Sequence, residues 1–271
     1  MSGIMPLAAT GVPALGGQII AIASGKGGVG KTWLAITLSH ALARAGQRVL
    51  LFDGDLGLAN VDVQLGLGQG PDLSAVVAGR LSLTDAVLKH EGGFDILAGL
   101  SGSGALAAVA PAALERLLAA LRTAASSYSA VLLDLGAGLD RSVRRMASFA
   151  DQLLVVVTDE PTSLTDAYAV LKLHGGDTPA ARRDSRVIVN MATSTATGTR
   201  TYETLARACT SFLGHTPPLA GIIRRDDHVR DSIRRQTLLL SRHPACTAAV
   251  DVEAIASNLS AAASPKASIR L

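Results

Sequence analysis

The chain has 271 residues, 48% of them hydrophobic and 17% charged, so it can bury a large core as one large domain or two small ones. Its formal net charge of +3 is too small to indicate a nucleic-acid-binding protein by itself. No apolar run approaches the ~18 residues of a membrane-spanning helix. Cys209 and Cys246 are isolated in the sequence, which predicts reduced core thiols of a cytosolic protein rather than redox or metal ligands.

Residues 18–260 are expected to form a single domain, because no linker or internal repeat divides them. Residues 1–17 are interrupted by Pro and Gly and contain no Lys or Arg, so they do not resemble a secretory signal. We expect a poorly ordered tail there and a flexible tail at 261–271.

Within that domain, short apolar runs alternate with stretches that carry apolar residues at helical spacing. The predicted strands are Ile19–Ala23, Arg48–Phe52, Phe94–Leu97, Ala130–Leu133, Leu153–Val157, Arg186–Val189 and Leu219–Ile223. The predicted helices are Trp33–Ala45, Pro111–Thr123, Asp140–Phe149, Ser163–His174, Thr199–Leu213, Asp227–Arg235 and Asp251–Leu259, with short helices at best between Gly54 and Glu91. Most strands lack polar alternation, as parallel strands covered on both faces do. The pattern predicts an α/β fold, a doubly wound and mostly parallel sheet with helices on both faces.

The segment from Ser24 to Thr32 reads Ser-Gly-Lys-Gly-Gly-Val-Gly-Lys-Thr and lies between the first predicted strand and helix. It fits G-x-x-x-x-G-K-[ST], in which backbone N–H groups surround phosphate oxygens at a helix N-terminus. Lys31 is expected to contact the β- and γ-phosphates, and Thr32 to ligate Mg²⁺. The candidate nucleotide-binding residues of this loop are Gly25, Lys26, Gly27, Gly28, Val29, Gly30, Lys31 and Thr32.

The glycines of the same loop also fit the dinucleotide fingerprint, and Asp53 follows at about the expected ~20 residues. Only a phosphate loop for a Mg-nucleotide gives Lys31 and Thr32 a role, however. We therefore favour Mg-nucleotide binding over a nicotinamide cofactor.

Carboxylates follow two of the predicted strands. Asp53 ends the second strand, and Asp134 ends Ala130–Leu133 before a small-residue loop. Ligands of such folds bind beyond the carboxyl ends of the strands, so both are expected near the Mg²⁺, with Asp134 as a Walker B-type carboxylate. Capping of the next helix is the alternative for Asp134.

Asp55 lies two residues after Asp53, so one carboxylate can face metal-bound water and the other the attacking water. The alternative is a loop in which an Asp or Asn caps a short helix. For Asn60 and Asp62 the two interpretations remain equally open.

With its additional lysine, Lys26, the phosphate loop resembles the deviant Walker A motif of the MinD/ParA ATPases, and the resemblance covers roughly Ile19 to Leu259. It implies a SIMIBI-type, MinD-like P-loop fold and ATP/ADP with Mg²⁺ as cofactors. In that family the lysine reaches across an ATP-dependent homodimer and contacts the partner's nucleotide.

The family's residue roles transfer to the matching positions here. The resemblance implies that Asp55 orients water and that Lys26 acts in trans, so these two are the catalytic candidates. It places Asp53 and Asp134 near the metal through water, beside Thr32. Asn190, at the end of a predicted strand, matches the adenine-contacting Asn.

Three further segments resemble the flagellar-number regulators of the FlhG/FleN type. They are Asp53–Asp62, Asp159–Ala169 and Arg234-Arg235-Gln236. The resemblance implies a cytoplasmic, slow ATPase switch that binds a flagellar transcriptional activator of the AAA+ type, with polar or peripheral membrane association through partners. The flagellar signal-recognition-type GTPase is a second candidate partner, which the absence of an Asp-Gln-Ala-type N-terminal motif disfavours.

The chain departs from its relatives at three places. Arg224 replaces a family proline in the adenine-facing loop before Asp226, which loosens the φ restriction; both residues are kept as ATP-binding candidates. Trp33 follows Thr32 where relatives have a small or polar residue, and packing beneath the loop is favoured over ligand contact. Residues 260–271 contain few bulky apolar side chains, so weak or absent membrane binding is expected.

A partitioning ATPase that binds DNA nonspecifically is the main rival function. The basic residues that could bind DNA are Arg224, Arg225, Arg230, Arg234, Arg235 and Arg242. They are interleaved with Asp residues, so a solvated helix face is favoured. An iron–sulfur scaffold ranks low because neither cysteine lies near the phosphate loop.

Overall fold

The structure is a computed structural model that describes residues 17–68, 70, 73–99, 109–178 and 184–263, the last three of them by their backbone alone. The expected tails at 1–17 and 261–271 therefore fall almost entirely outside the described residues.

An eight-stranded sheet forms the centre of the molecule, with the strand order β3-β4-β2-β5-β1-β6-β7-β8. Its strands are β1 Gln18–Ser24, β2 Val49–Gly54, β3 Leu88–Lys89, β4 Asp95–Leu97, β5 Ala130–Ala137, β6 Gln152–Val157, β7 Ser185–Ala192 and β8 Leu219–Arg224. Only β3, at one edge, pairs antiparallel. The mostly parallel, doubly wound sheet predicted from the sequence is confirmed, and the two-residue β3 is the strand that was not predicted.

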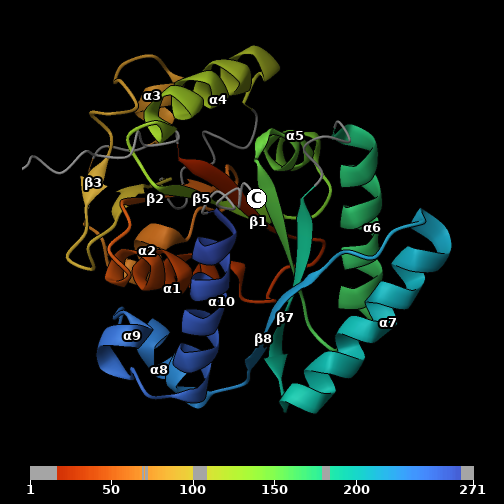
Figure 1. Ribbon diagram of the computed structural model, residues 1–271. Coiled ribbons are helices and arrows are strands. Elements are labelled where there is room, and N and C mark those ends of the chain that lie inside the picture. Colours follow the sequence, from red (N-terminus) through yellow and green to blue (C-terminus); the bar gives the residue numbers. More distant parts are fainter. Residues whose placement is uncertain (1–16, 69, 71–72, 100–108, 179–183, 264–271) are drawn as a thin grey trace, which may run out of the picture.

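Helices cover both faces of this sheet (Figure 1). They are α1 Lys31–Arg44, α2 Val61–Leu65, α3 Leu73–Val77, α4 Pro111–Ala125, α5 Arg141–Phe149, α6 Pro161–Asp177, α7 Thr195–Leu213, α8 Asp227–Arg234, α9 Leu239–Arg242 and α10 Thr247–Ala263. None of the described helices combines enough length with enough hydropathy to span a bilayer.

Successive residues of β1 belong to different cores, which explains why the strands read as continuous apolar runs. Ile19 and Ala21 pack in the core under α4, α5, α6 and α7, whereas Ile20 and Ile22 pack in the core under α1, α9 and α10. Since both faces of the strand are covered, polar alternation would bury unpaired polar groups.

The start of α6 differs from the prediction because proline begins it. Pro161 occupies the first turn, where its missing N–H is not needed and its φ suits the helix. Helix α7 likewise begins at Thr195, earlier than predicted, because the Ser194 side chain accepts a hydrogen bond from the Thr197 N–H.

The topology places the carboxyl ends of the central parallel strands at one edge of the sheet. β1 lies between β5 and β6, and β5 lies between β1 and β2. The phosphate-loop candidate follows β1, and the predicted carboxylates Asp53 and Asp134 are direct partners in the β2–β5 register. Segments far apart in sequence therefore meet where ligands of such sheets bind.

Candidate nucleotide-binding site

The loop between β1 and α1 has the backbone of an anion-binding turn. Gly28 and Gly30 have φ angles of 80° and 89°, which favour glycine. A Cβ atom on Gly30 would lie only 2.6 Å from Asn190 Nδ2. Gly30 caps α1 without any side-chain hydrogen bond, so the first N–H groups of the helix remain available to a phosphate.

Lys31 is buried at the beginning of α1, with 8% of its surface exposed. Its Nζ donates to Ser24 Oγ at 2.9 Å, and Ser24 Oγ donates to the Lys26 carbonyl oxygen at 2.6 Å. Burial lowers the pKa of Lys31, while the charges of Asp134 and Asp55 oppose that shift. A buried cation held by one hydroxyl group retains donors for a phosphate oxygen.

Two buried carboxylates lie opposite each other on the neighbouring strands β2 and β5. Asp53 accepts hydrogen bonds from the backbone N–H groups of Asp55 at 3.2 Å and of Asn60 and Val61 at 3.1 Å. Asp134 bonds to Thr32, while its Oδ1 has no partner among the described residues. Burial raises the pKa of Asp53 to about 6 and that of Asp134 to about 7, and the charge of Asp53 contributes to the second shift.

The potential ligand atoms of Thr32, Asp53 and Asp134 fit Mg²⁺. A hydroxyl group and two carboxylates supply only oxygen ligands, which this hard cation prefers. The unpartnered oxygen of Asp134 is the kind of buried polar atom that metal-bound water would satisfy. The structure thus brings together Thr32, Asp53 and Asp134, the three residues predicted to surround the metal.

Asp55 lies on the turn that follows β2. Its Oδ1 accepts from the N–H groups of Gly57 at 3.2 Å and Leu58 at 2.9 Å. A Cβ atom on Gly136 would approach the same oxygen to 3.2 Å. Gly136, near the end of β5, thus lets that strand come close to the turn after β2, and the Asp55 side chain lines the cleft.

Lys26 is held within its own chain. Its Nζ pairs with Glu160 and donates to Thr162 Oγ1 at 3.2 Å. Glu160 belongs to the Asp159–Ala169 motif, but it was not among the predicted site residues. Contact of Lys26 with a second subunit remains a prediction.

Asn190, at the end of β7, is only 3% exposed and supports the phosphate loop. Its Nδ2 donates to the Val29 carbonyl oxygen at 2.8 Å, and its Oδ1 accepts from the N–H of Met191 at 2.9 Å. Met191 has a positive φ of 58°. Contact of Asn190 with adenine remains a prediction.

Arg224 and Asp226 line the same cleft, yet their charged groups are bound by other parts of the chain. The Arg224 guanidinium donates from Nε and Nη2 to Asp251 of α10 at 2.9 and 2.8 Å. Asp226 accepts from the His228 N–H and from Thr247 Oγ1, so it caps α8. The predicted contact of both residues with ATP remains a prediction.

The cleft between these elements has a volume of about 840 Å³. Its lining includes several apolar residues that were not predicted as site residues: Leu58, Leu135, Met191, Ile223, Val229 and Ile233. Apolar residues carry no signal of their own in a sequence, since most of them pack in cores. Trp33 also borders the cleft but is only 6% exposed and belongs to the core under α1, as the packing interpretation expected.

Comparison with known proteins agrees with this geometry. Residues 20–239 match the family described as the CobQ/CobB/MinD/ParA nucleotide binding domain. The chain is 38% identical over 239 residues to the antiactivator FleN of Pseudomonas aeruginosa, covering 88% of this chain and 85% of that protein. It is 31% identical over 188 residues to the flagellum site-determining protein YlxH of Helicobacter pylori, covering 69% of this chain and 63% of YlxH.

Among solved structures, the septum site-determining protein MinD of Pyrococcus horikoshii, complexed with Mg-ADP, is similar with a TM-score of 0.76 and 25% identity. The match covers 93% of this chain and 99% of that chain. These findings confirm the predicted family and Mg²⁺ with ATP or ADP as the cofactors. The chain belongs to the MinD/ParA family of P-loop nucleotide-binding ATPases.

Proposed function

We propose that this chain is an ATP-dependent dimerising switch of the FlhG/FleN type. In this proposal it hydrolyses ATP slowly and restrains flagellar biogenesis by binding a transcriptional activator of the AAA+ type. Two relatives are named for flagellar functions, an antiactivator and a site-determining protein. The observation that carries the proposal is Lys26, an additional lysine of the phosphate loop that pairs with Glu160, a residue lining the nucleotide cleft.

Exposed apolar residues around that cleft support dimerisation. Six large apolar side chains are exposed among the described residues, and two of them, Leu58 and Met191, line the cleft. Leu58 is 72% exposed. A second copy facing the first across the nucleotides would cover them and remove apolar surface from water.

The proposed chemistry divides the site residues into three roles. The backbone of Gly25 to Thr32 and the Lys31 ammonium bind the phosphates, and Asp55 orients the attacking water. Thr32, with Asp53 and Asp134 through water, holds the Mg²⁺, which neutralises charge on the phosphates. Lys26 of the second subunit stabilises transition-state charge as an arginine finger does, an effect of ~10³–10⁵ in rate.

Light scattering with ADP and with ATP, on wild type and Asp55→Ala, tests this proposal. We expect monomers with ADP, dimers with ATP, and a long-lived ATP dimer for Asp55→Ala because hydrolysis no longer releases it. Lys26→Ala should bind nucleotide yet lose dimerisation or turnover. Wild type that remains monomeric with a non-hydrolysable triphosphate and Mg²⁺ contradicts the proposal.

A partitioning ATPase is the second candidate, because Arg225, Arg230 and Arg234 have no ion-pair partner among the described residues. Arg235 and Arg242, by contrast, both pair with Asp231, which favours the solvated face expected from the sequence. ATP-dependent gel shifts on random DNA, with a steep dependence on salt, would support this candidate. Binding to the activator rather than to DNA or to the signal-recognition-type GTPase supports the flagellar switch.

A further inference from the structure

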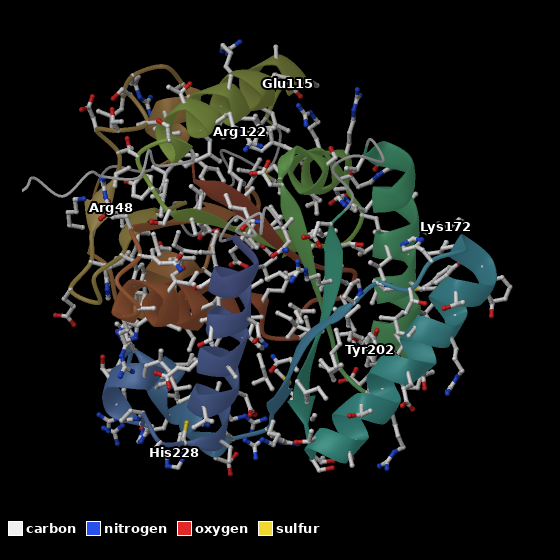
Figure 2. All side chains as sticks on the ribbon, viewed as in Figure 1. Arg48, Glu115, Arg122, Lys172, Tyr202 and His228 are labelled. Atoms are coloured by element: carbon white, nitrogen blue, oxygen red, sulfur yellow. The ribbon has the colours of Figure 1, made fainter. Side chains whose placement is uncertain are left out.

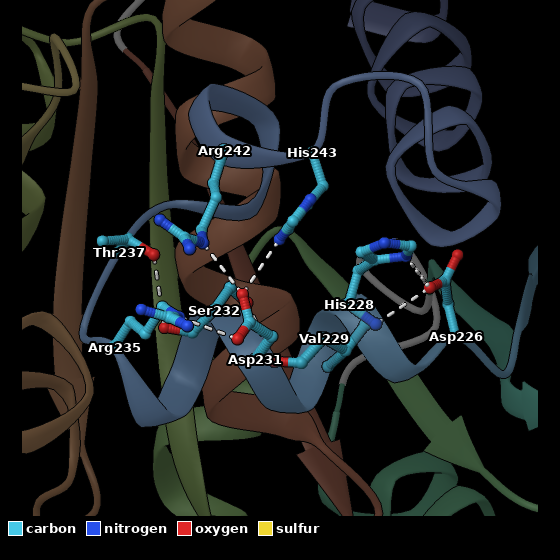
Figure 3. A network of polar contacts seen from close by, with 9 residues as sticks. All are labelled: Asp226, His228, Val229, Asp231, Ser232, Arg235, Thr237, Arg242 and His243. Atoms are coloured by element: carbon cyan, nitrogen blue, oxygen red, sulfur yellow. Dashed lines mark hydrogen bonds and ion pairs between the residues drawn. The ribbon is translucent and has the colours of Figure 1, made fainter.

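The N-terminal ends of α8 and α10 meet beside the nucleotide cleft, and potential metal ligands cluster there. Asp226, His228 and Cys246 each bring one donor atom within 4.8 Å of the other two. Figure 2 shows His228 at the edge of the molecule, and Figure 3 shows its ring beside Asp226. The second cysteine, Cys209, is fully buried in the opposite core.

We propose that Asp226, His228 and Cys246 form a binding site for one divalent transition-metal ion of the zinc class, with water completing the coordination. Sulfur and imidazole nitrogen are ligands that Zn²⁺ and Co²⁺ accept and that Mg²⁺ does not prefer. These ligands therefore differ in chemistry from the oxygen-only Mg²⁺ ligands of Thr32, Asp53 and Asp134.

The spacing of the donor atoms suits such an ion. Tetrahedral zinc, with Zn–N of about 2.0–2.1 Å and Zn–S of about 2.3 Å, separates its ligand atoms by roughly 3.3–3.6 Å. His228 Nδ1 lies 2.8 Å from Asp226 Oδ1, and the His228 side chain is 54% exposed. The exposed imidazole can turn to widen this separation and admit an ion without disturbing the core, and the Cys246 sulfur lies within 4.8 Å of both other donor atoms.

Surrounding contacts hold Asp226 in place and support one side of the His228 ring. Asp226 is held by the backbone N–H of His228 at 3.0 Å and by Thr247 Oγ1 at 2.6 Å. The His243 ring packs with its centroid 4.3 Å from that of His228, and Asp231 accepts from His243 Nε2 at 3.0 Å (Figure 3). Such outer contacts orient metal ligands and raise affinity.

The charges of the site also balance. Coordination takes Cys246 as the thiolate and releases its proton to solvent. The thiolate and the Asp226 carboxylate then carry two negative charges, which match the ion. The backbone N–H groups of Ala248 and Ala249 at the start of α10 favour the thiolate. Burial and the charge of Asp226, however, raise the pKa of Cys246, so the ion has to displace the thiol proton. A bound ion would tie α8 to α10 at the rim of the nucleotide cleft.

Cobalt titration of the full-length, tag-free protein tests the site. The protein is stripped with a chelator, saturated with Mg-ADP to fill the nucleotide site, and titrated with Co²⁺ and then Zn²⁺. We expect one Co²⁺ per chain with sulfur-to-cobalt charge-transfer absorption, which Zn²⁺ displaces. Cys246→Ser should abolish that absorption, and Cys209→Ala should retain it.

His228→Ala provides a second variant on an exposed side chain, whose folding is not at risk. It should weaken Zn²⁺ binding by about tenfold or more, whereas His215→Ala, also exposed, should not. Absence of charge-transfer absorption at saturating Co²⁺ overturns the proposal. The proposal is also overturned if the absorption persists in Cys246→Ser, or if the affinity for Zn²⁺ is unchanged in His228→Ala.

Discussion

The two ends of the nucleotide cleft are built differently. The phosphate end comes from one contiguous loop, Ser24–Thr32, and from two carboxylates at neighbouring strand ends. The end formed by β7, β8 and α8 comes from residues far apart in sequence. At the phosphate end, Asp134 has an unpartnered oxygen and Lys31 is held by a single hydroxyl group.

At the other end, the three predicted site residues are already bound by other parts of the chain. Asn190 binds the phosphate-loop carbonyl of Val29, Arg224 binds Asp251, and Asp226 caps α8. The phosphate end therefore retains unsatisfied charge for a ligand, whereas Asn190, Arg224 and Asp226 at the other end already have partners within the chain. We expect most of the binding free energy of the nucleotide to come from its phosphates.

Lys31→Ala breaks the phosphate end most directly, and we expect the largest effect from it. It removes the only buried ammonium group of the loop, so the affinity for ADP should fall by about 100-fold or more, ~2.7 kcal/mol. Calorimetric titration with Mg-ADP measures this. Lys172→Ala, on the exposed surface of α6 (Figure 2), is the matched control and should bind as wild type does.

The residues of the phosphate end could be predicted from the sequence, whereas the contacts at the other end could not. Lys31, Thr32, Asp53 and Asp134 were found because a contiguous motif or a strand end marks them. The bond from Asn190 to Val29 spans 161 positions, and that from Arg224 to Asp251 spans 27. No local pattern encodes such partners, because tertiary packing alone brings them together.

Short elements were missed for a related physical reason. β3 has two residues and α9 has four, too few for any hydrophobic period to emerge. Both are stabilised by neighbours in space, β3 by pairing with β4 and α9 by packing against α1. The positive φ of Met191 and of Gln236 likewise has no sequence signal, since neither residue favours it.

The paired carboxylates predict how stability depends on pH without metal or nucleotide. The pKa values of Asp53 and Asp134 in the folded state, about 6 and about 7, lie above those of the unfolded chain. The folded state therefore binds more protons, and the free energy of unfolding should decrease as pH rises from about 4 to about 7, by on the order of a few kcal/mol.

Thermal unfolding at several pH values, in chelator, measures this slope. Asp134→Asn should flatten it, because the buried amide no longer titrates, while Asp140→Asn on the exposed surface should leave it unchanged. Added Mg-ADP should also flatten it. A stability that rises with pH over this range would contradict the charge arrangement described for the phosphate end.

Gly30→Ala tests the close contact between the phosphate loop and Asn190, where the two ends of the cleft meet. Its φ of 89° is strained for alanine, and the new Cβ would lie 2.6 Å from Asn190 Nδ2. Gly46→Ala is the matched control, with a φ of 82° and nothing within 4 Å of its Cβ. The control should lose about 1–2 kcal/mol from backbone strain alone, and Gly30→Ala should lose more in thermal unfolding and also bind Mg-ADP less tightly.

Arg224→Ala should have the smallest effect on stability and on nucleotide affinity. It tests directly whether the β8 end of the cleft contributes to nucleotide binding. Arg224 and Asp251 form a two-pronged ion pair with side chains 35% and 14% exposed, so solvent screening limits the expected loss of stability to ~1 kcal/mol. Because the guanidinium already binds Asp251, the dissociation constant for Mg-ADP should change by less than about threefold, or ~0.7 kcal/mol. A tenfold loss of ADP affinity with unchanged thermal stability would instead mean that Arg224 leaves Asp251 and contacts the nucleotide, so that this end of the cleft also depends on its ligand.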